Sequence, residues 1–276
     1  MRHQNLIKVV AMTAALGLIS LVRAPSADAA EEDVPDHPVL RDAWYISGGA
    51  LYARSNVVAS LNKTLLGTLI DFEDDLGLDR YDWMGLWTVR WHFTKRWQLE
   101  VEYFNLDRSN TQSLERNITW GNLNVPVTAT AHSRFNIEDF RVGIGYSFFK
   151  TQDKEVGIGL GAHVARLQAG LTTTNFGSEE TSESAPLPFI TTYVRLALTD
   201  RWLLSMRVDR LSLSSGDIDG SVFSSGLDVI YSPWRHFSFG LGYRDIDWQI
   251  SSSSNRWNGR AQVQESGPMV FIATQF

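Results

Sequence analysis

The stretch SGPMVFIATQF, residues 266–276, decides the fold of this chain, because its pattern is that of a β-strand. Side chains alternate along a strand, so residues 270, 272, 274 and 276 share one face and residues 269, 271, 273 and 275 share the other. The sequence stops on the aromatic Phe276, whereas the termini of soluble domains are usually mobile and polar. We therefore expect this strand to close a membrane barrel, with Phe276 in the aromatic girdle at the periplasmic interface.

The other end of the sequence predicts a secretory signal peptide. Arg2 and Lys8 precede an apolar run over residues 9–22, and the small-residue site A-D-A follows at residues 27–29. This order is typical of an exported protein, and the apolar run is too short to cross a membrane as a helix. We expect residues 1–30 to be a cleaved signal peptide.

Charge and composition exclude several kinds of partner and site. Three of the 25 basic and one of the 31 acidic residues lie within residues 1–30, so the remainder carries a formal net charge of −8. This charge argues against nucleic acid as a partner, which needs clustered Lys and Arg. The absence of cysteine excludes disulfides and thiolate metal sites. No later apolar run approaches the ~18 residues of a spanning helix, so a mature chain that crosses a membrane must do so as a closed barrel.

The clearest alternation lies in residues 82–104 and predicts a hairpin. Its first strand carries aromatic and apolar residues on one face (Trp83, Trp87, Val89, Trp91 and Phe93) and Arg90 and His92 on the other. After a turn at residues 94–96, Trp97, Leu99 and Val101 oppose Glu100 and Glu102. One face of the hairpin is therefore suited to hydrocarbon and the other to an enclosed polar interior.

Comparable alternation predicts ten strands over residues 43–276, with eight or twelve as alternatives, behind an extended polar leader at residues 31–42. The third strand is expected to continue towards Trp120, and the fourth to begin near Val125. Short turns near residues 94–96, 149–154, 199–201 and 232–235 alternate with wider connections near 57–81, 121–124, 172–186, 214–219 and 251–257. The predicted fold is one all-β domain, a single antiparallel up-and-down transmembrane β-barrel with both termini on the short-turn, periplasmic side.

Two further features refine this prediction. Glycine at residues 157, 159 and 161 is too regular for a turn, and it predicts either room for long side chains opposite or a sharply curved strand. A soluble periplasmic β-sandwich is the alternative fold, but the apolar faces run without charge over the ~9–11 residues that cross a bilayer. Aromatic residues near the strand ends predict a membrane girdle made of Trp83, Trp87, Trp91, Trp97, Trp202, Trp234 and Phe276.

Taken together, the signal peptide, the alternation, the girdle and the terminal Phe276 resemble the small outer-membrane β-barrel proteins of Gram-negative bacteria. The general plan is similar to that of the OmpA and OmpW type, although those families have eight strands. The resemblance implies export through the periplasm to the outer membrane and recognition of Phe276 by the barrel assembly machinery. It also implies contact with outer-membrane lipid and lipopolysaccharide.

The inward faces gather charged residues, which predict a charged lumen. The candidates are Arg90, His92, Glu100, Glu102, Asp139, Arg141, Arg195, Arg207, Asp209, Asp228 and Arg244, with Glu155 on the same face. One interpretation is a charged constriction that selects ions. The other, which we favour, is a salt-bridge core that fills a narrow barrel, because unpaired charges there would be costly. At about eight strands side chains just fill a barrel, and ten leave little more room.

The first wide connection contains a weak calcium motif. Asp71, Glu73, Asp75 and Asp82 fit the first, third, fifth and twelfth positions of an EF-hand loop. The sixth position is Leu76 where glycine is needed, and position twelve lacks the bidentate Glu. We favour a solvated acidic loop facing lipopolysaccharide, and we expect the apolar residues Leu65, Leu66, Leu69, Ile70 and Phe72 to fold it back on the barrel.

No catalytic motif stands out in the sequence. There is no G-x-S-x-G elbow and no H-E-x-x-H, and no Asp-x-Asp occurs together with Asp-x-His. His132, Ser133 and Asp139 can be combined on paper, but they lie along one strand. We therefore expect no catalytic residues, no cofactor and no enzymatic activity, with an outer-membrane hydrolase as a minor alternative.

The most direct functional interpretation is an outer-membrane barrel that is structural or is a narrow, porin-like solute channel. The alternative is a surface-loop binding or adhesion protein. The loop at residues 172–186 is polar and acidic with few aromatic residues, which disfavours an adhesive hot spot. The sequence does not specify a solute, a ligand or an oligomeric state.

Overall fold

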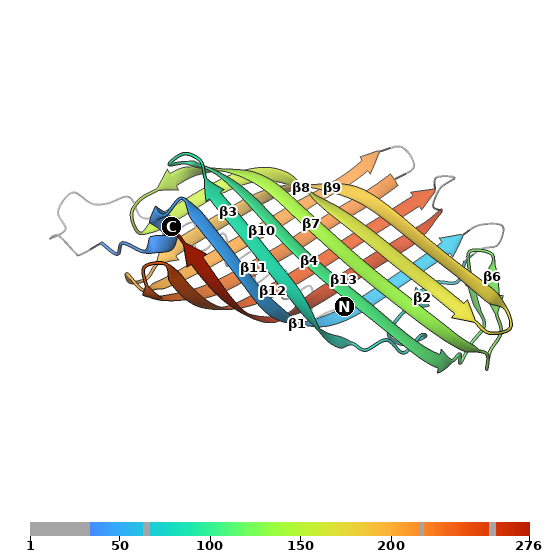
Figure 1. Ribbon diagram of the computed structural model, residues 1–276. Helices are drawn as coiled ribbons and strands as arrows, with labels where there is room; N and C mark the ends of the chain where they lie inside the picture. The colour runs from blue at the N-terminus through green and yellow to red at the C-terminus, as the bar shows by residue number, and fades with distance from the viewer. Residues whose placement is uncertain (1–33, 63–66, 216–217, 254–257) are drawn as a thin grey trace.

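A computed structural model describes residues 34–62, 67–215, 218–253 and 258–276, and a ring of antiparallel strands dominates it (Figure 1). The long strands are β1 (Trp44–Asn62), β3 (Tyr81–His92), β4 (Trp97–Ser113), β7 (Thr130–Lys150), β8 (Lys154–Thr173), β9 (Gly177–Ala197), β10 (Trp202–Ser215), β11 (Ile218–Trp234), β12 (Phe237–Ser253) and β13 (Asn258–Gln275). Shorter elements are α2 (Pro38–Arg41), β2 (Ile70–Asp71), β5 (Ile118–Trp120) and β6 (Leu123–Val125). The fold is thus an all-β, up-and-down ring of about ten strands. Among the described residues, no helix is long and apolar enough to cross a membrane.

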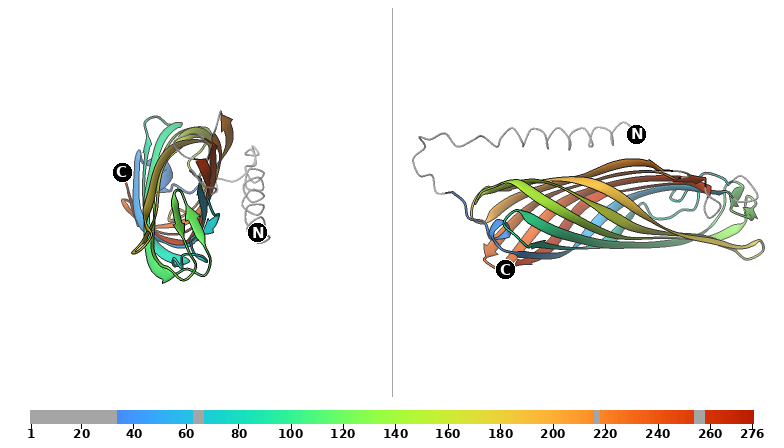
Figure 2. Two further views of the ribbon diagram at one scale, coloured as in Figure 1. Left: turned by 90° about the vertical axis from the view of Figure 1, so that its right-hand side faces the viewer. Right: turned by 90° about the horizontal axis from the view of Figure 1, so that it is seen from above.

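The first and last strands of the ring pair with each other. β1 and β13 are antiparallel partners from Tyr45 opposite Gln275 to Asn62 opposite Asn258. At the end of this seam, the Trp44 amide donates to the Phe276 carbonyl at 2.8 Å and the Phe276 amide donates back at 3.1 Å. Figure 2 shows the ring from one end. The stretch 266–276 therefore lies in the strand that joins the two edges of the sheet.

The outside of the ring is apolar and aromatic over the part next to the short turns. Cross-strand aromatic pairs lie at the short-turn edge, with ring centroids 5.3 Å apart for Trp44 and Trp91 and 4.7 Å apart for Trp202 and Tyr231. At the far edge Tyr52 packs against Tyr81 and Trp83. We call the surface between these two edges the apolar band. All the predicted girdle residues are exposed on it: Trp83, Trp87, Trp91, Trp97, Trp202, Trp234 and Phe276.

The girdle residues do not all lie at an edge of the apolar band. Trp83 lies at the far edge, whereas Trp91 and Trp97 lie near the short turns. Trp87 lies between these two edges of β3, where its ring covers Gly48 of β1 so closely that a Cβ on that glycine would come within 2.5 Å of it. Trp87 therefore belongs to the middle of the band.

Most strands continue far beyond the apolar band. β7 and β9 have 21 residues each and β8 has 20, about twice the ~9–11 residues that cross a bilayer. The polar loop predicted at residues 172–186 is wrong, because β8 runs to Thr173 and β9 begins at Gly177. The Thr173 hydroxyl accepts from the Phe176 amide and donates to the Gly177 carbonyl, and Gly177 adopts a φ of 96° that favours glycine.

The other wide connections also differ from the sequence-based expectation. The loops predicted near residues 214–219 and 251–257 lie partly outside the described residues, and their described residues belong to β10, β11 and β12, so this part of the prediction is wrong. β4 ends at Ser113 and not near Trp120, and β7 begins at Thr130 and not near Val125. Between them β5 and β6 form a separate hairpin, in which Ile118 pairs with Val125. Its apolar residues alternate like a barrel strand, but they are buried at the outer end of the ring.

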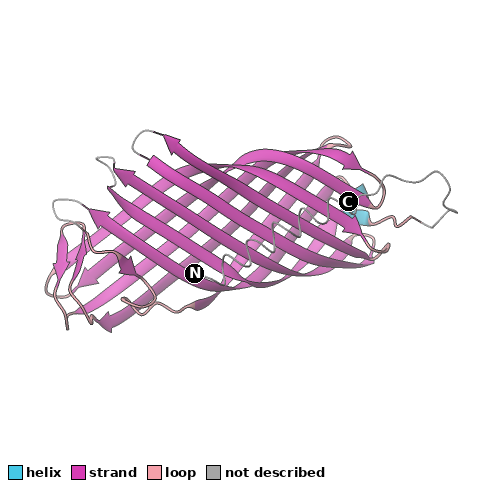
Figure 3. Ribbon diagram, turned by 180° about the vertical axis from the view of Figure 1, so that it is seen from behind, coloured by secondary structure: helices cyan, strands magenta, loops and turns pink. Residues whose placement is uncertain are grey.

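The leader before β1 is not simply extended. His37 caps α2 by accepting the Val39 amide at its Nδ1, 3.3 Å away. Val39 and Leu40 are 2% and 3% exposed, and Figure 3 shows the helix at the short-turn end of the ring. Burial lowers the pKa of His37 to about 4, so this side chain is neutral near pH 7. The extended polar leader predicted at residues 31–42 is therefore wrong for residues 37–40. These residues lie at the short-turn mouth of the ring, where their apolar side chains are buried.

Glycine at alternate positions of β8 makes room for aromatic side chains. A Cβ on Gly157 would lie 2.2 Å from the ring of Tyr193, and a Cβ on Gly161 would lie 2.6 Å from the ring of Phe189. These aromatic residues stand opposite the two glycines on β9. The expectation that the glycine face leaves space for long side chains is therefore confirmed.

We predict that Gly157→Leu lowers the free energy of unfolding by about 1–3 kcal/mol, the usual cost of overpacking. The Tyr193 ring cannot move aside without losing the hydrogen bond between its hydroxyl and that of Ser147, which are 3.0 Å apart. Gly85→Leu is the matched control, since Gly85 is exposed and a Cβ on that glycine would meet nothing within 4 Å. Denaturant titration of the protein in micelles, followed by tryptophan fluorescence, measures both. Equal losses for the two variants would contradict the packing argument.

Candidate functional site

Glu100 on β4 is the centre of a buried ion-pair network inside the ring. Its carboxylate lies 2.8 Å from Arg90 Nε, 3.0 Å from Arg141 Nη1 and 2.8 Å from Arg207 Nη1. β3 and β7 flank β4, whereas β10 is separated from β4 by β7, β8 and β9. The contact between Glu100 and Arg207 therefore crosses the lumen and ties opposite walls of the ring together.

Arg141 and Arg207 extend the network to two more carboxylates. Arg141 holds Asp209 with two parallel bonds, at 2.6 Å from Nε and 3.0 Å from Nη2, a geometry that favours a strong, directional pair. Its guanidinium also lies 4.4 Å from the ring centroid of Phe189. Arg207 Nη2 lies 2.8 Å from Glu102. The Arg141 and Asp209 side chains are at most 1% exposed, so neither charge has water to replace its partner.

A second cluster surrounds Glu155 close to the short-turn mouth. Its carboxylate lies 2.7 Å from Arg195 Nη1, 3.1 Å from Lys150 Nζ and 3.2 Å from His92 Nε2. The Ser147 hydroxyl donates to it at 2.7 Å. Four partners from β3, β7 and β9 thus hold a single carboxylate, whose side chain is completely buried.

The remaining inward charges also have partners. His163 Nδ1 lies 2.8 Å from Asp139, and its ring packs between Phe189 and Trp248 at centroid distances of 5.0 and 5.3 Å. Arg244 and Asp228 are joined by bonds of 2.6 and 3.2 Å. The structure thus places every predicted lumen residue on the inner face: Arg90, His92, Glu100, Glu102, Asp139, Arg141, Arg195, Arg207, Asp209, Asp228 and Arg244.

Sequence reasoning assigned no role to Lys150, Ser147 and Tyr193, although all three complete the network. Ser147 and Tyr193 lie on the inward face of their strands, so the same alternation could have drawn attention to them. Lys150 was placed in a turn, but it is the last residue of β7 and reaches Glu155 from there.

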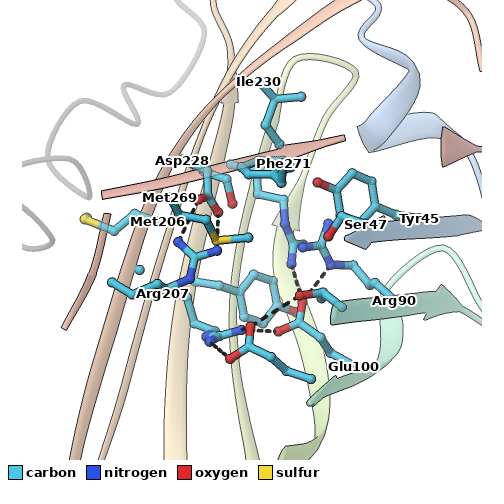
Figure 4. A pocket seen from close by; sticks show the side chains of 17 residues that line it. Tyr45, Ser47, Arg90, Glu100, Met206, Arg207, Asp228, Ile230, Met269 and Phe271 are labelled. Carbon is cyan, nitrogen blue, oxygen red and sulfur yellow. Dashed lines mark hydrogen bonds and ion pairs between the residues drawn. The ribbon is translucent and has the colours of Figure 1, made fainter. Parts of the chain in front are cut away.

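The network leaves little open space in the ring. A cavity of about 30 Å³ is lined by Tyr45, Arg90, Glu100, Arg207, Asp228 and Phe271, among others, and a neighbouring one beside Arg141 measures about 10 Å³. Figure 4 shows the side chains of the larger cavity converging on this space. A cavity of this size holds about one or two water molecules. At this level the lumen is filled by paired charges.

Beyond the ion pairs, the outer part of the ring has an apolar core. Phe72, from the connection after β1, packs its ring at 6.0 Å from Trp120 and 5.4 Å from Phe135. The expectation that this connection folds back is confirmed for Ile70 and Phe72, which are 1% and 2% exposed, and is wrong for Leu69, which is 52% exposed. Leu65 and Leu66 lie outside the described residues.

Side chains of β4 fasten this connection in place. Asn110 Nδ2 donates to the carbonyls of Leu76 and Gly77 at 3.0 and 2.9 Å, and Gln112 Nε2 donates to that of Asp75 at 2.8 Å. Arg108 adds a buried ion pair to Glu73 at 2.6 Å. These inward polar residues satisfy backbone groups that would otherwise be buried without partners. Next to β4, the outer end of the ring is thus occupied by its own connections, whereas the ends of β10–β13 line an open pocket of about 350 Å³ that includes Ser212, Gln249 and Arg260.

The four carboxylates of the calcium motif do not converge. Glu73 binds Arg108 and the Val57 amide, and Asp75 binds Arg116. Asp71 Oδ1 accepts amides of its own turn, and Asp82 Oδ1 accepts the Trp83 amide. Within the described ranges, no group of three or more His, Asp or Glu residues is arranged to hold a metal ion.

The three residues considered as a possible catalytic triad, His132, Ser133 and Asp139, also each hydrogen-bond to a different residue. His132 Nδ1 is hydrogen-bonded to the Thr111 hydroxyl at 2.9 Å on the outer surface. Ser133 is turned inward and donates to the Asn110 carbonyl, while Asp139 binds His163. A nucleophile and its base must lie within hydrogen-bond reach of each other, and these three do not.

The comparisons with known proteins agree with this architecture. Neither a protein-family model nor a curated protein matches the chain. Among solved structures, the outer membrane protease OmpT from Escherichia coli aligns with a TM-score of 0.53 and 8% identity, over 85% of this chain and 97% of that one. This chain has the fold of an outer-membrane β-barrel protein. The resemblance to that class is therefore confirmed.

Two further solved structures align less closely. The attachment invasion locus protein Ail of Yersinia pestis has a TM-score of 0.32 and 11% identity, over 83% of this chain and 98% of that one. The translocator domain of the autotransporter NalP from Neisseria meningitidis has a TM-score of 0.39 and 9% identity, over 100% and 96%. At these TM-scores neither alignment supports a statement about this chain.

Glu265 on β13 is a buried carboxyl beyond the apolar band. It is 1% exposed and accepts a hydrogen bond from the Ser55 hydroxyl. Burial raises the pKa of Glu265 to about 7 from 4.5, because nearby Arg108 only partly offsets the loss of water and because Glu73 and Asp82 add negative charge. The folded state therefore holds this proton more tightly than the unfolded chain does.

This shift predicts a pH dependence of stability. The protonated Glu265 contributes at most about 3 kcal/mol to the free energy of unfolding. This contribution is fully present below about pH 4.5 and is lost as the pH rises through about 7. We expect Glu265→Gln to be more stable than the parent protein at pH 8 and equally stable at pH 4.5. Thermal melts at the two pH values measure this. A Glu265→Gln protein less stable than the parent at pH 8 would refute it.

Removing one partner of the central network is expected to be costly. We predict that Arg141→Met destabilises the fold by about 3–5 kcal/mol, because Asp209 and Glu100 would keep buried charges with one partner fewer. Arg54→Met is the control, since Arg54 is an exposed residue of β1. Denaturant midpoints report both changes, and an Arg141→Met loss as small as that of the control would show that the network adds nothing to stability.

Proposed function

We propose that the mature chain resides in a bacterial outer membrane as a closed barrel with a structural role in the envelope. The fold is that of outer-membrane proteins, and the apolar band gives the ring a surface suited to hydrocarbon. On β12, for example, the outward residues of the band are Phe237, Phe239, Leu241 and Tyr243. Aromatic residues at both edges of such a band are typical of barrels in a bilayer.

The filled lumen is the observation that favours a structural role and disfavours a channel. At the level of Glu100 the free space is about 30 Å³, and the guanidinium of Arg207 spans the ring. At the outer end, Phe72 and Trp120 form part of an apolar core. A solute channel would need continuous polar space from one end of the ring to the other, so we favour a barrel that does not conduct.

A surface-binding role is the second candidate. The strands beyond the apolar band form a rigid surface outside the proposed membrane, and its outward residues on β7 include His132 and Arg134. Such a surface suits a polar partner better than an apolar one. Whole-cell binding assays with and without the protein address this role.

We further propose that the chain is not an enzyme and holds no cofactor. The proposal is supported by the separate partners of His132, Ser133 and Asp139. The inner His163 is sealed between aromatic rings, which leaves it out of reach of a substrate.

Planar-bilayer recording tests the closed barrel. We expect the purified mature protein to insert, shown by heat-modifiable gel migration, and to give no reproducible conductance steps. Arg207→Ala is the informative variant, because it removes the side chain that crosses the lumen at Glu100; the outer core should keep it silent as well. A known porin in the same bilayers is the control. Reproducible ion conductance by the parent protein would overturn the proposal.

A further inference from the structure

A cavity of about 490 Å³ opens at the short-turn mouth of the ring. Its walls include Leu40 and Arg41 of α2, Lys95 and Arg96 of the turn between β3 and β4, and the strand-end residues His92 of β3 and Lys150 of β7. The volume falls within the range of small-molecule sites. The cavity borders the ion-pair network, because His92 and Lys150, which hold Glu155, also line it, whereas Glu100 and its partners do not.

The lining of this cavity is strongly cationic. It includes Arg41, Lys95, Arg96 and Lys150, and no Asp or Glu among the described residues lines it. Two of these cations already have partners, since Arg41 pairs with Asp36 at 2.8 Å and Lys150 with the buried Glu155 at 3.1 Å. Lys95 and Arg96 are exposed and make no ion pair with any described residue. The cavity therefore has two uncompensated positive charges.

The turn that carries these two charges is held in one conformation. The Thr94 hydroxyl accepts the amides of Arg96 and Trp97 at 3.3 and 3.0 Å. The Arg96 carbonyl accepts the Ser147 amide at 2.7 Å, which fixes the turn to β7. A site whose backbone is already ordered loses less entropy when it binds a ligand.

We propose that this cavity binds a phosphate group, with Lys95 and Arg96 as its principal ligands. Arg and Lys together suit a tetrahedral oxyanion, because a guanidinium donates two parallel bonds and an ammonium adds a point charge. Arg41 and Lys150 add positive potential around the site. The apolar residue Leu40 in the lining leaves room for an organic group attached to the phosphate.

The phosphate can come from a lipid headgroup or from a soluble compound. The neighbourhood favours a headgroup, because Arg96 Nη1 also reaches the Tyr146 hydroxyl at 3.4 Å, and Tyr146 pairs with the exposed Trp97 at the edge of the apolar band. The inference does not depend on whether the barrel conducts, so the bilayer recordings and the binding test can fail separately.

The test uses the mature protein in uncharged detergent micelles and has two arms. Isothermal titration with inorganic phosphate and with glycerol phosphate measures the soluble arm. Native mass spectrometry after mixing with phosphatidylglycerol, against phosphatidylcholine, measures the lipid arm. The test variant is Lys95→Gln/Arg96→Gln. The matched control is Arg201→Gln/Arg235→Gln, which removes the same charge from other short turns at the same end, outside the cavity.

We expect the parent protein to bind in at least one arm, the test variant to bind at least about tenfold more weakly, and the control to stay within about twofold of the parent. Binding in the lipid arm alone identifies a headgroup site, and binding in the soluble arm identifies a free-phosphate site. Heat-modifiable migration establishes that both variants are folded. No binding in either arm, or equal losses in the two variants, would overturn the proposal, since equal losses mean diffuse attraction to the whole rim.

Discussion

The hydrogen bonds between β1 and β13 are the interaction on which the rest of this structure depends. A sheet surrounded by hydrocarbon cannot leave backbone amides and carbonyls unpaired, because no water is there to satisfy them. Pairing from Tyr45 opposite Gln275 to Asn62 opposite Asn258 gives both edges a partner. The same pairing makes the sheet a tube, and every inward side chain must then share one narrow space.

The ring fills that space in two different ways along its length. Within the apolar band the centre of the lumen is filled by paired charges, as Glu100 is paired with Arg90, Arg141 and Arg207. Beyond the band the inner residues become apolar and pack against the connection after β1 and the β5–β6 hairpin. Both arrangements leave little room for water. The first is made by side chains of the strands alone, whereas the second also needs residues from the connections between the strands. This division explains why the outer connections are buried and the short turns are not.

How far the sequence predicts the structure depends on the surroundings of each strand. The prediction is correct for residues 82–104, because a strand between the apolar band and a charged lumen has two chemically different faces. It is wrong for residues 172–186, because beyond the band the outer face of a strand is polar and resembles a loop in sequence. The inward residues could be predicted from alternation, but the partnership of Glu100 with Arg207 could not. That partnership depends on how far side chains reach across the ring. The alternation of residues along a strand shows which face a side chain is on, but not which side chain it meets.

The long hairpin of β8 and β9 projects far beyond the apolar band. From Ile190 at the band to Gly177 at the tip, the strand rises on the order of 30 Å once its tilt is allowed for. Its tip is a turn of three residues between Thr173 and Gly177, held by two paired strands. A foreign peptide inserted into that turn would be held rigidly at a fixed height above the apolar band, and the ring below would not have to change shape to carry it.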